Sequence, residues 1–255
     1  MFTGVKTNSH TLGFDHGIVL DDVNSEATAT KVKSIIHHAQ EAGKDTGIVT
    51  TTRITHATPA AMYAHTAERD WECFLDLQRA EEELSESVAN KTHEIAWQLI
   101  NEAPGKNLKV MLGGGKSAFK PKDPEERFDY DSGYAWNCSS QGRNFIDEFT
   151  NASSQNQFVE TMSELMAIDA DQTYRLLGLF NDYHLLYDHE RAEKSIPEYQ
   201  DSPSLANMTR KAIEMLKKNT EHGFVLLVEG GRIDHAHHGT YANRYNSIFR
   251  FHKKN

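Results

Sequence analysis

The sequence predicts an α/β fold, a three-layer sandwich in which helices cover a mostly parallel central sheet. Segments with helical apolar spacing alternate with short apolar runs, the pattern of parallel strands joined by helical crossovers. The 255 residues are 38% hydrophobic, which is enough for one sizeable core and predicts one domain. Polar side chains follow two of the apolar runs directly, where parallel strands bring ligand-binding loops together.

The first half of the chain contains two expected helix–strand pairs. Residues 28–42 carry apolar side chains at helical spacing, and Gly43 stands where a helix would end. The β-branched run 46–52 predicts a strand. The second pair is a helix over 91–102 and a strand over 108–112, so the two pairs together begin the alternating pattern.

The second half continues the alternation. We expect a helix over 155–168, a strand over 174–180, a helix over 204–218 and a buried strand over 224–229. Between the halves, residues 116–151 are rich in Pro, Asp, Gly and Asn. This composition predicts an irregular surface excursion rather than a linker between domains.

Charge and composition exclude some classes of partner. The formal net charge of −10 argues against nucleic acid, because phosphate backbones need clustered Lys and Arg. No stretch approaches the length of a membrane span, and Met1–Gly4 is not a signal peptide. Cys73 and Cys138 permit one disulfide or two free thiols.

Four glycosylation sequons indicate in which cellular compartment the protein is made and located. Each is an Asn followed two residues later by Ser or Thr, and together they favour an extracellular origin. They lie at Asn90, Asn137, Asn151 and Asn207.

The run from Val228 to His238 is the most informative in the chain. Asp234 and His238 are four residues apart, about one helical turn, so on a helix both face one point. Carboxylate plus imidazole suits Zn²⁺, whereas Glu229 at the strand end suits a harder ion with oxygen ligands. A solvated His-rich surface is the alternative, but the buried-strand pattern before this run favours a metal site.

A second polar cluster follows the expected strand at 46–52. On an extended strand end, His56 and Thr58 project to the same side. The Thr58 hydroxyl suits Mg²⁺, and His56 is a candidate ligand or partner of a metal-bound water. The alternative is that Thr58 caps a helix that begins at Pro59. Arg69 would then lie near the far end of that helix and reach back toward an anion, although a surface ion pair is the commoner outcome for an Arg.

Taken together, these segments resemble the alkaline phosphatases, and most closely the animal form. The likeness covers residues 1 to about 244, in the family's order and spacing, and its long metal motif is highly specific. The segments that carry it are Gly4–Thr7, Gly47–Arg53, His56–Ala60, Tyr63–Thr66, Leu112–Gly115 and Val228–His235.

The resemblance implies a phosphomonoesterase with two Zn²⁺ and one Mg²⁺. By residue-for-residue match, Thr58 and Glu229 are Mg²⁺ ligands, while Asp234 and His238 are two of the ligands of one zinc ion. In the family a Ser nucleophile attacks phosphorus, a phosphoserine forms, and zinc-bound hydroxide hydrolyses it. The resemblance also implies a homodimer located outside the cell, secreted or held at the plasma membrane by a lipid anchor.

Three further side chains match positions around the family's metals. Arg69 matches the arginine that binds phosphate. His56 stands in the position characteristic of the animal enzymes, and His235 matches a histidine that lies beside the metal ligands without binding the ion. The family's calcium site is matched only in part, because Glu125 matches a ligand but Asn181 stands where a Glu is expected.

The sequence departs from the family pattern at both ends. The Asp-Ser-Ala segment with the nucleophile and the first-strand Asp would lie before Met1. Residues 245–255 do not continue the likeness, so the later Asp-His pair and the last zinc-binding His are absent. We therefore expect residues 1–255 to be a partial domain, from an incomplete gene model or a truncated product, and to be inactive alone. An unpaired sheet edge would make it prone to aggregate.

Two other functions compete with this interpretation. One is a catalytically inactive metal-binding fragment or isoform. The other is a different metal phosphohydrolase of the same superfamily, such as a phosphodiesterase. The joint presence of Arg69 with the His56 and Thr58 pair favours the monoesterase.

Overall fold

The computed structural model describes residues 2–74, 92–121, 138–140, 142–192 and 201–240. A five-stranded sheet runs through its centre in the order β3-β4-β2-β1-β5, and every paired strand is parallel to its neighbour. The predicted α/β class is therefore confirmed. The strands are β1 Asp45–Arg53, β2 Val110–Gly114, β3 Asn156–Val159, β4 Arg175–Leu179 and β5 Phe224–Glu229.

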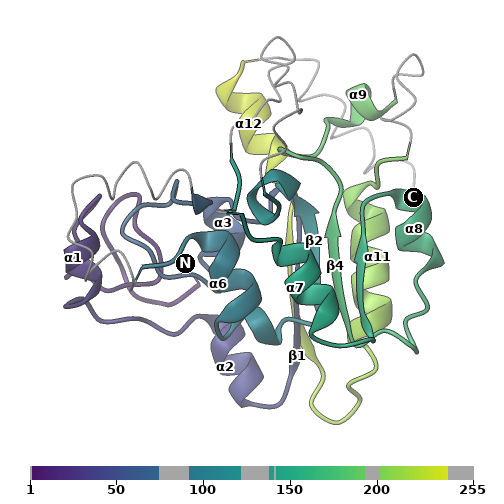
Figure 1. Cartoon of the computed structure of the whole chain (residues 1–255), viewed down its shortest axis with the longest axis horizontal. Helices are drawn as coiled ribbons and strands as arrows, with labels where there is room; N and C mark the ends of the chain where they lie inside the picture. Colours follow the sequence, from purple (N-terminus) through teal and green to yellow (C-terminus); the bar gives the residue numbers. More distant parts are fainter. Residues whose placement is uncertain (1, 75–91, 122–137, 141, 193–200, 241–255) are drawn as a thin grey trace.

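Helices cover both faces of the sheet (Figure 1). Side chains of successive strand residues point to opposite faces, so the apolar side chains on each face need a covering layer. On one face, Ile48 and Met111 pack with side chains from α2, α6 and α7. On the other, Val49 and Leu112 pack with α8 and α11. These helices are α2 Ile35–Glu41, α6 Ile95–Asn101, α7 Phe145–Asn151, α8 Met162–Ala167 and α11 Leu205–Leu216.

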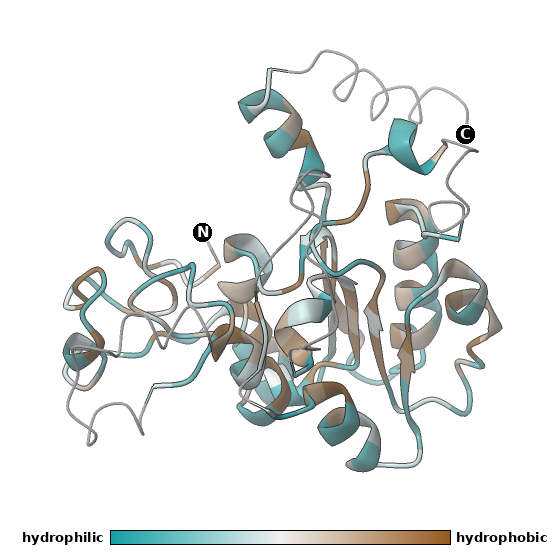
Figure 2. Cartoon of the chain, turned by 45° about the horizontal axis from the view of Figure 1, so that its top comes forward, coloured by the Kyte–Doolittle hydropathy of each residue, from teal (hydrophilic) through white to brown (hydrophobic). Residues whose placement is uncertain are grey.

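The remaining helices are short. In Figure 1, α1 lies to one side of the sheet, and α9 and α12 lie above its upper end. A small separate core around Phe14 and Trp71 contains Val23 of α1. Figure 2 shows the strands as the most apolar part of the chain, with hydrophilic residues on the outer helix faces. The short elements are α1 Val23–Glu26, α3 Ala57–Ala60, α9 Asp188–Arg191, α12 Arg232–His238 and the 3₁₀ turns Gly105–Asn107 and Lys116–Phe119.

Two of the predicted helices are wrong in extent. The helix expected over 28–42 begins only at Ile35, because the Ser34 hydroxyl caps it by accepting from His37 N. The helix expected over 155–168 divides into β3 and α8. A capping box at Thr161 and Glu164 starts α8, while β3 pairs with β4 along the sheet edge. Helical apolar spacing concealed this edge strand.

Two expectations about burial are also wrong. The excursion over 116–151 is not a surface segment in its described parts, since Phe119, Phe145 and Phe149 are buried in the main core. The strand over 224–229 was expected to be buried, but β5 is the edge strand of the described sheet. Its side chains are half-buried or exposed as a result.

A disulfide joins Cys73 to Cys138, with the Cα atoms 5.8 Å apart. This resolves the two alternatives that the sequence left open for these cysteines. None of the helices in the described ranges is long and apolar enough to cross a bilayer.

Candidate active site

The carboxyl ends of β1 and β5 meet because the two strands are paired, with Thr50 opposite Glu229. The Thr50 hydroxyl donates to Glu229 Oε2 at 2.6 Å, and the Thr52 hydroxyl lies 3.4 Å from the same oxygen. The predicted Mg²⁺ ligand is thus held at the end of its strand by hydroxyl groups of the neighbouring strand. An oriented carboxylate of this kind suits a hard cation.

Helix α12 starts directly after β5 and presents the second pair of candidate ligands. Asp234 Oδ2 and His238 Nε2 lie 3.6 Å apart on one helical turn, and both side chains are largely exposed. Gly231 permits the sharp entry into this helix, since a Cβ there would lie 2.4 Å from the Thr52 methyl group. The spacing of the two ligand atoms fits a shared ion such as Zn²⁺.

The local geometry expected around Thr58 is wrong. His56 is the residue before α3, and Thr58 lies inside α3, so no extended strand aims the two side chains together. Thr58 also does not cap the helix. It is half-buried and makes no side-chain hydrogen bond to any residue that the structure describes.

The position expected for Arg69 is wrong as well, although its direction agrees with the proposed role. Helix α3 ends at Ala60, so Arg69 lies in a later turn rather than at a helix end. Its Nη2 lies 3.2 Å from His56 Nε2, and its Nε lies 3.8 Å from the exposed Asp70 carboxylate. The guanidinium group therefore faces the candidate site, and the ion pair it makes among the described residues is a long one at the surface.

A third histidine, His184, completes a cluster that the sequence reasoning missed. The rings of His56, His184 and His235 pack against one another with centroids 4.3 to 5.3 Å apart. Their nearest ring nitrogens all lie within 4.8 Å of each other. His184 follows β4 by a few residues, so its place after a strand end was the available indication.

An arginine contacts each imidazole of this cluster. Besides Arg69 at His56, Arg53 Nη1 lies 2.7 Å from His184 Nε2, and Arg232 Nη1 lies 3.1 Å from His235 Nδ1. The candidate site thus concentrates positive charge beside neutral imidazoles. Such an arrangement can bind an oxyanion through its guanidinium groups.

Burial keeps these histidines neutral. Desolvation, followed by the charges of Arg53 and Arg69, lowers the pKa of His56 to about 3. Desolvation and Arg232 lower the pKa of His235 to about 4. The same causes, burial first and Arg53 next, lower the pKa of His184 far below its ordinary value.

A buried ion pair between Arg53 and Glu72 holds the histidine cluster in place through His184. Arg53 Nε donates to Glu72 Oε2 at 2.8 Å, and the Thr55 hydroxyl donates to the same oxygen at 2.5 Å. Arg53 N donates to His184 Nδ1 at 3.0 Å. Burial opposes the charge on Arg53, but the attraction of Glu72 outweighs it and the pKa of Arg53 is raised. These contacts connect β1 to the loop that carries His184.

The structure does not test the calcium match, since it describes only one of the two residues considered for it. Glu125 lies outside the described residues. The Asn181 side-chain oxygen accepts from Tyr183 N at 3.0 Å, and its backbone oxygen accepts from Gly115 N and Lys116 N. Asn181 thus shapes a turn.

Comparison with known proteins decides the family. The sequence model described as alkaline phosphatase matches residues 1–247. This chain belongs to the alkaline phosphatase family. The membrane-bound alkaline phosphatase of Bombyx mori is 39% identical over 94% of this alkaline phosphatase chain and 42% of its own length. The human tissue-nonspecific isozyme is 36% identical, over 92% of the chain and 42% of its own.

The solved structures agree with the fold. The crystal structure of Thermus thermophilus alkaline phosphatase superposes with a TM-score of 0.66 at 30% identity. The match covers 97% of this alkaline phosphatase chain and 40% of the Thermus chain. The chain therefore spans about two fifths of the length of the relatives it matches.

Proposed function

We propose that the protein to which this chain belongs hydrolyses phosphate monoesters through a transient phosphoserine. The observation that carries the proposal is the convergence of Arg69 and His56 with His235, the neighbour of Asp234, at the carboxyl edge of the sheet. A planar guanidinium group directed into such a site can bind two phosphoryl oxygens at once. Family membership supports the reaction class.

We assign the metal ligands by the same match. Thr58 and Glu229 would hold Mg²⁺, and Asp234 and His238 would hold one Zn²⁺, with His56 and His235 beside them. When bound, these ions would neutralise phosphoryl charge and acidify the attacking oxygen. The strand-end placement of Glu229 and the 3.6 Å spacing of Asp234 and His238 support the assignment. We propose no calcium site.

Side chains of the chain itself would bind the phosphoryl group, form hydrogen bonds beside it and hold the histidine rings in position. Arg69 would exchange its contact with His56 for the substrate phosphoryl group, which offers it a full negative charge. His56 and His235, neutral because of burial, would accept or donate hydrogen bonds at this edge without adding charge. Arg53 and Glu72 would keep His184, and through it the other two rings, in place.

We further propose that the 255-residue chain alone has negligible turnover. No Asp-Ser-Ala segment occurs in it, and the Asp234 and His238 pair supplies two protein ligands where a catalytic zinc needs about three. This observation favours a second candidate function for the isolated chain, metal binding without catalysis.

Two measurements test these proposals: phosphatase activity of the whole protein, and Zn²⁺ binding by the isolated chain. The whole protein to which this chain belongs, supplied with Zn²⁺ and Mg²⁺, should hydrolyse p-nitrophenyl phosphate with a kcat on the order of 10 per second. Arg69→Ala should lower its kcat/KM about 100-fold or more, because an oriented donor to the phosphoryl oxygens is lost. Arg143→Ala, at a surface ion pair, is the matched control.

The 255-residue chain should bind Zn²⁺ in equilibrium dialysis without such turnover. Asp234→Asn with His238→Gln should weaken that binding. Faster hydrolysis of bis(p-nitrophenyl) phosphate than of the monoester would instead favour the phosphodiesterase, and an unchanged kcat/KM in Arg69→Ala would refute the role of Arg69.

Partners and location are also proposals. We propose phosphate monoester substrates, a homodimer, and a place outside the cell, secreted or on a lipid anchor. The disulfide and the printed name of the Bombyx relative support an extracellular setting. Of the sequons in the described ranges, Asn151 is exposed at the end of α7 and suits glycosylation, whereas Asn207 is half-buried in α11.

A further inference from the structure

A positively charged pocket lies at the amino ends of the strands, opposite the candidate active site. Its walls are the turn before β1, the 3₁₀ turn Gly105–Asn107, the segment between α7 and β3, and the start of β4. It has a volume of about 400 Å³. None of the described residues that line it was assigned to the metals or to the phosphoryl group.

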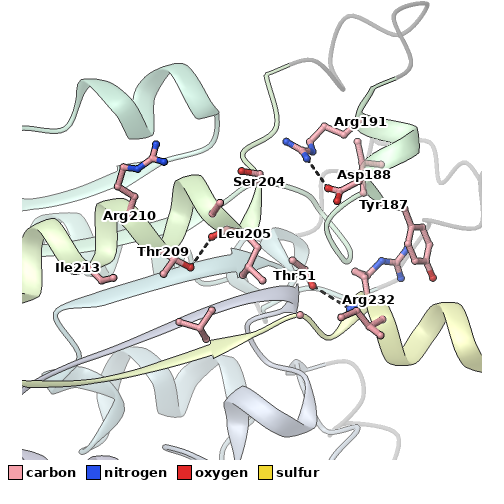
Figure 3. Close-up of a pocket in the computed structure, with 15 residues that line it drawn as sticks. Thr51, Tyr187, Asp188, Arg191, Ser204, Leu205, Thr209, Arg210, Ile213 and Arg232 are labelled. Atoms are coloured by element: carbon pink, nitrogen blue, oxygen red, sulfur yellow. Dashed lines mark hydrogen bonds and ion pairs between the residues drawn. The ribbon is translucent and has the colours of Figure 1, made fainter. Parts of the chain in front are cut away.

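A larger cavity beside α11 and β5 belongs to the surroundings of the candidate active site (Figure 3). Figure 3 shows its lining residue Arg232 bonded to Thr51 of β1, and Arg232 also contacts His235. The positively charged pocket shares none of its described lining residues with that cavity. It is formed at the ends of β1, β2, β3 and β4, away from the edge strand β5.

The positively charged pocket is lined by a buried arginine, Arg175, whose side chain is only 9% exposed. Its Nε donates to Leu108 O at 2.8 Å, and its Nη2 lies 3.9 Å from Met111 Sδ. The ring of Phe149 lies against the guanidinium group, with its centroid 4.9 Å from Cζ. None of these groups is negatively charged, and Arg175 forms no ion pair with a carboxylate in the described part of the chain.

A buried charge without a counterion is costly, because burial removes its hydration and nothing replaces it. Burial lowers the pKa of Arg175 to about 10, and the neighbouring Tyr174 opposes this only in part. The guanidinium group is therefore still charged at neutral pH. An anion that entered the pocket would supply the counterion that the described residues do not.

Two lysines add positive charge at the mouth of the pocket. Lys44 and Lys106 both line it and are exposed, and Lys44 Nζ donates to His222 O at 2.5 Å. No Asp or Glu occurs among the described lining residues. Three cations around one concavity raise the local concentration of anions, even in a chain of net charge −10.

We propose that this pocket binds a small oxyanion with two negative charges, of the sulfate or phosphate kind. Arg175 would be its buried anchor, because a planar guanidinium group can bind two oxygens of one anion. Lys106 and Lys44 would hold it at the rim. Three cations favour a dianion over a carboxylate of single charge. A flat polyanion would meet the lysines but not the recessed Arg175. The proposal does not depend on the phosphatase function.

Equilibrium dialysis of radiolabelled sulfate tests the proposal on the whole protein to which this chain belongs. Every sample carries Arg69→Ala, so that the arginine of the candidate active site cannot hold the anion. We expect saturable binding of one sulfate per chain, displaced by inorganic phosphate and far less by acetate. Loss of all sulfate binding in the Arg69→Ala background would overturn the proposal.

Two further variants locate the bound sulfate. Arg175→Gln should weaken its binding about tenfold or more, the loss expected for a charged hydrogen bond. Since this substitution is at a buried position, circular dichroism checks the fold, and the exposed Lys106→Glu provides a second variant.

Lys106→Glu should also weaken sulfate binding about tenfold, because a carboxylate at the rim repels the anion. Lys217→Glu is the matched control, at an exposed lysine at the end of α11 that does not line the pocket. It should leave sulfate binding unchanged. Equal sulfate affinities of Lys106→Glu and Lys217→Glu would refute the pocket as the binding site, whatever the phosphatase assay shows.

Discussion

At the residue scale, the pair of Arg53 and Glu72 is the most consequential interaction that the sequence did not reveal. Both side chains are more than nine-tenths buried, and together they hold His184. A buried charge that loses its partner is strongly destabilising, because the remaining ion stays out of water. The stability of this pair and the geometry of the histidine cluster are therefore linked.

We expect Glu72→Gln to lower the free energy of unfolding by about 3 to 5 kcal/mol, because Arg53 would remain buried without its carboxylate. Urea denaturation at neutral pH measures this change. Glu148→Gln removes a surface ion pair with Arg143 and should change stability by less than about 1 kcal/mol. Equal effects of the two substitutions would contradict the account of the buried pair.

His65 gives a prediction for pH. It packs edge-on against Phe14, and burial followed by the charge of Lys31 lowers its pKa to about 4. The unfolded chain, with an ordinary histidine pKa of about 6.5, binds the proton more readily, so stability is full above that pH and falls toward pH 4. His184, also held neutral by burial, acts in the same direction.

Between about pH 7.5 and pH 5, His65 should account for a loss on the order of 2 kcal/mol. Urea midpoints at the two pH values measure the loss. His65→Gln cannot take up the proton and should flatten the dependence, whereas the exposed His222→Gln should not. A His65→Gln chain with the same pH dependence as the original would rule out this assignment.

At the element scale, α11 illustrates how one helix serves two surfaces. Leu216 and Met208 are fully buried against β1 and β2, while Ile213 on the other side lines the cavity beside β5 (Figure 3). Its 12 residues lie within the predicted range of 204–218. Strong helical periodicity made this element predictable.

Leu216→Ala should destabilise the chain by about 2 to 5 kcal/mol, because it leaves a cavity against the sheet. Ile213→Ala is the matched control on the same helix and should cost less than about 1 kcal/mol, since that side chain is already largely exposed. Thermal or urea unfolding of both variants checks the contrast. A larger loss for Ile213→Ala would mean that α11 packs the other way round.

Element boundaries were less predictable than element types. The apolar residues around Phe158 and Met162 fit a helix as well as a strand followed by a helix. The capping box at Thr161 and the pairing of β3 with β4 decide between these possibilities. A side-chain cap can be sought in a sequence, but pairing with a strand almost 20 residues away cannot be inferred from local spacing.

At the scale of the whole molecule, β5 forms an exposed edge of the described sheet. It pairs with β1 on one side only among the described strands, and Phe224 and Val228 are more than a third exposed. An edge strand with apolar side chains can pair with another copy. The expectation from the sequence, that an unpaired sheet edge promotes aggregation, stays a prediction.

The 255-residue chain should associate as its concentration rises. Val228→Lys places a charge on the exposed edge and should reduce that association, whereas Val159→Lys, at a buried position, should unfold the chain instead. Light scattering with sedimentation velocity follows association, and circular dichroism reports folding. A sharply sedimenting monomer at all concentrations would contradict the prediction.

The sequence by itself determined the features that depend on local spacing. The alternation of helices and strands, the strand end at Glu229 and the single helical turn that carries Asp234 and His238 all follow from residues a few positions apart. Family likeness over residues 1–247 agrees with that interpretation.

Only the tertiary structure decided which strand ends meet. Arg53 and His184 are 131 residues apart, and Thr50 and Glu229 are 179 apart, yet both pairs are hydrogen-bonded. The position of Arg69 in a turn facing His56 likewise depends on how the chain folds back beside β1. Such contacts follow from strand order and packing, which local periodicity does not encode.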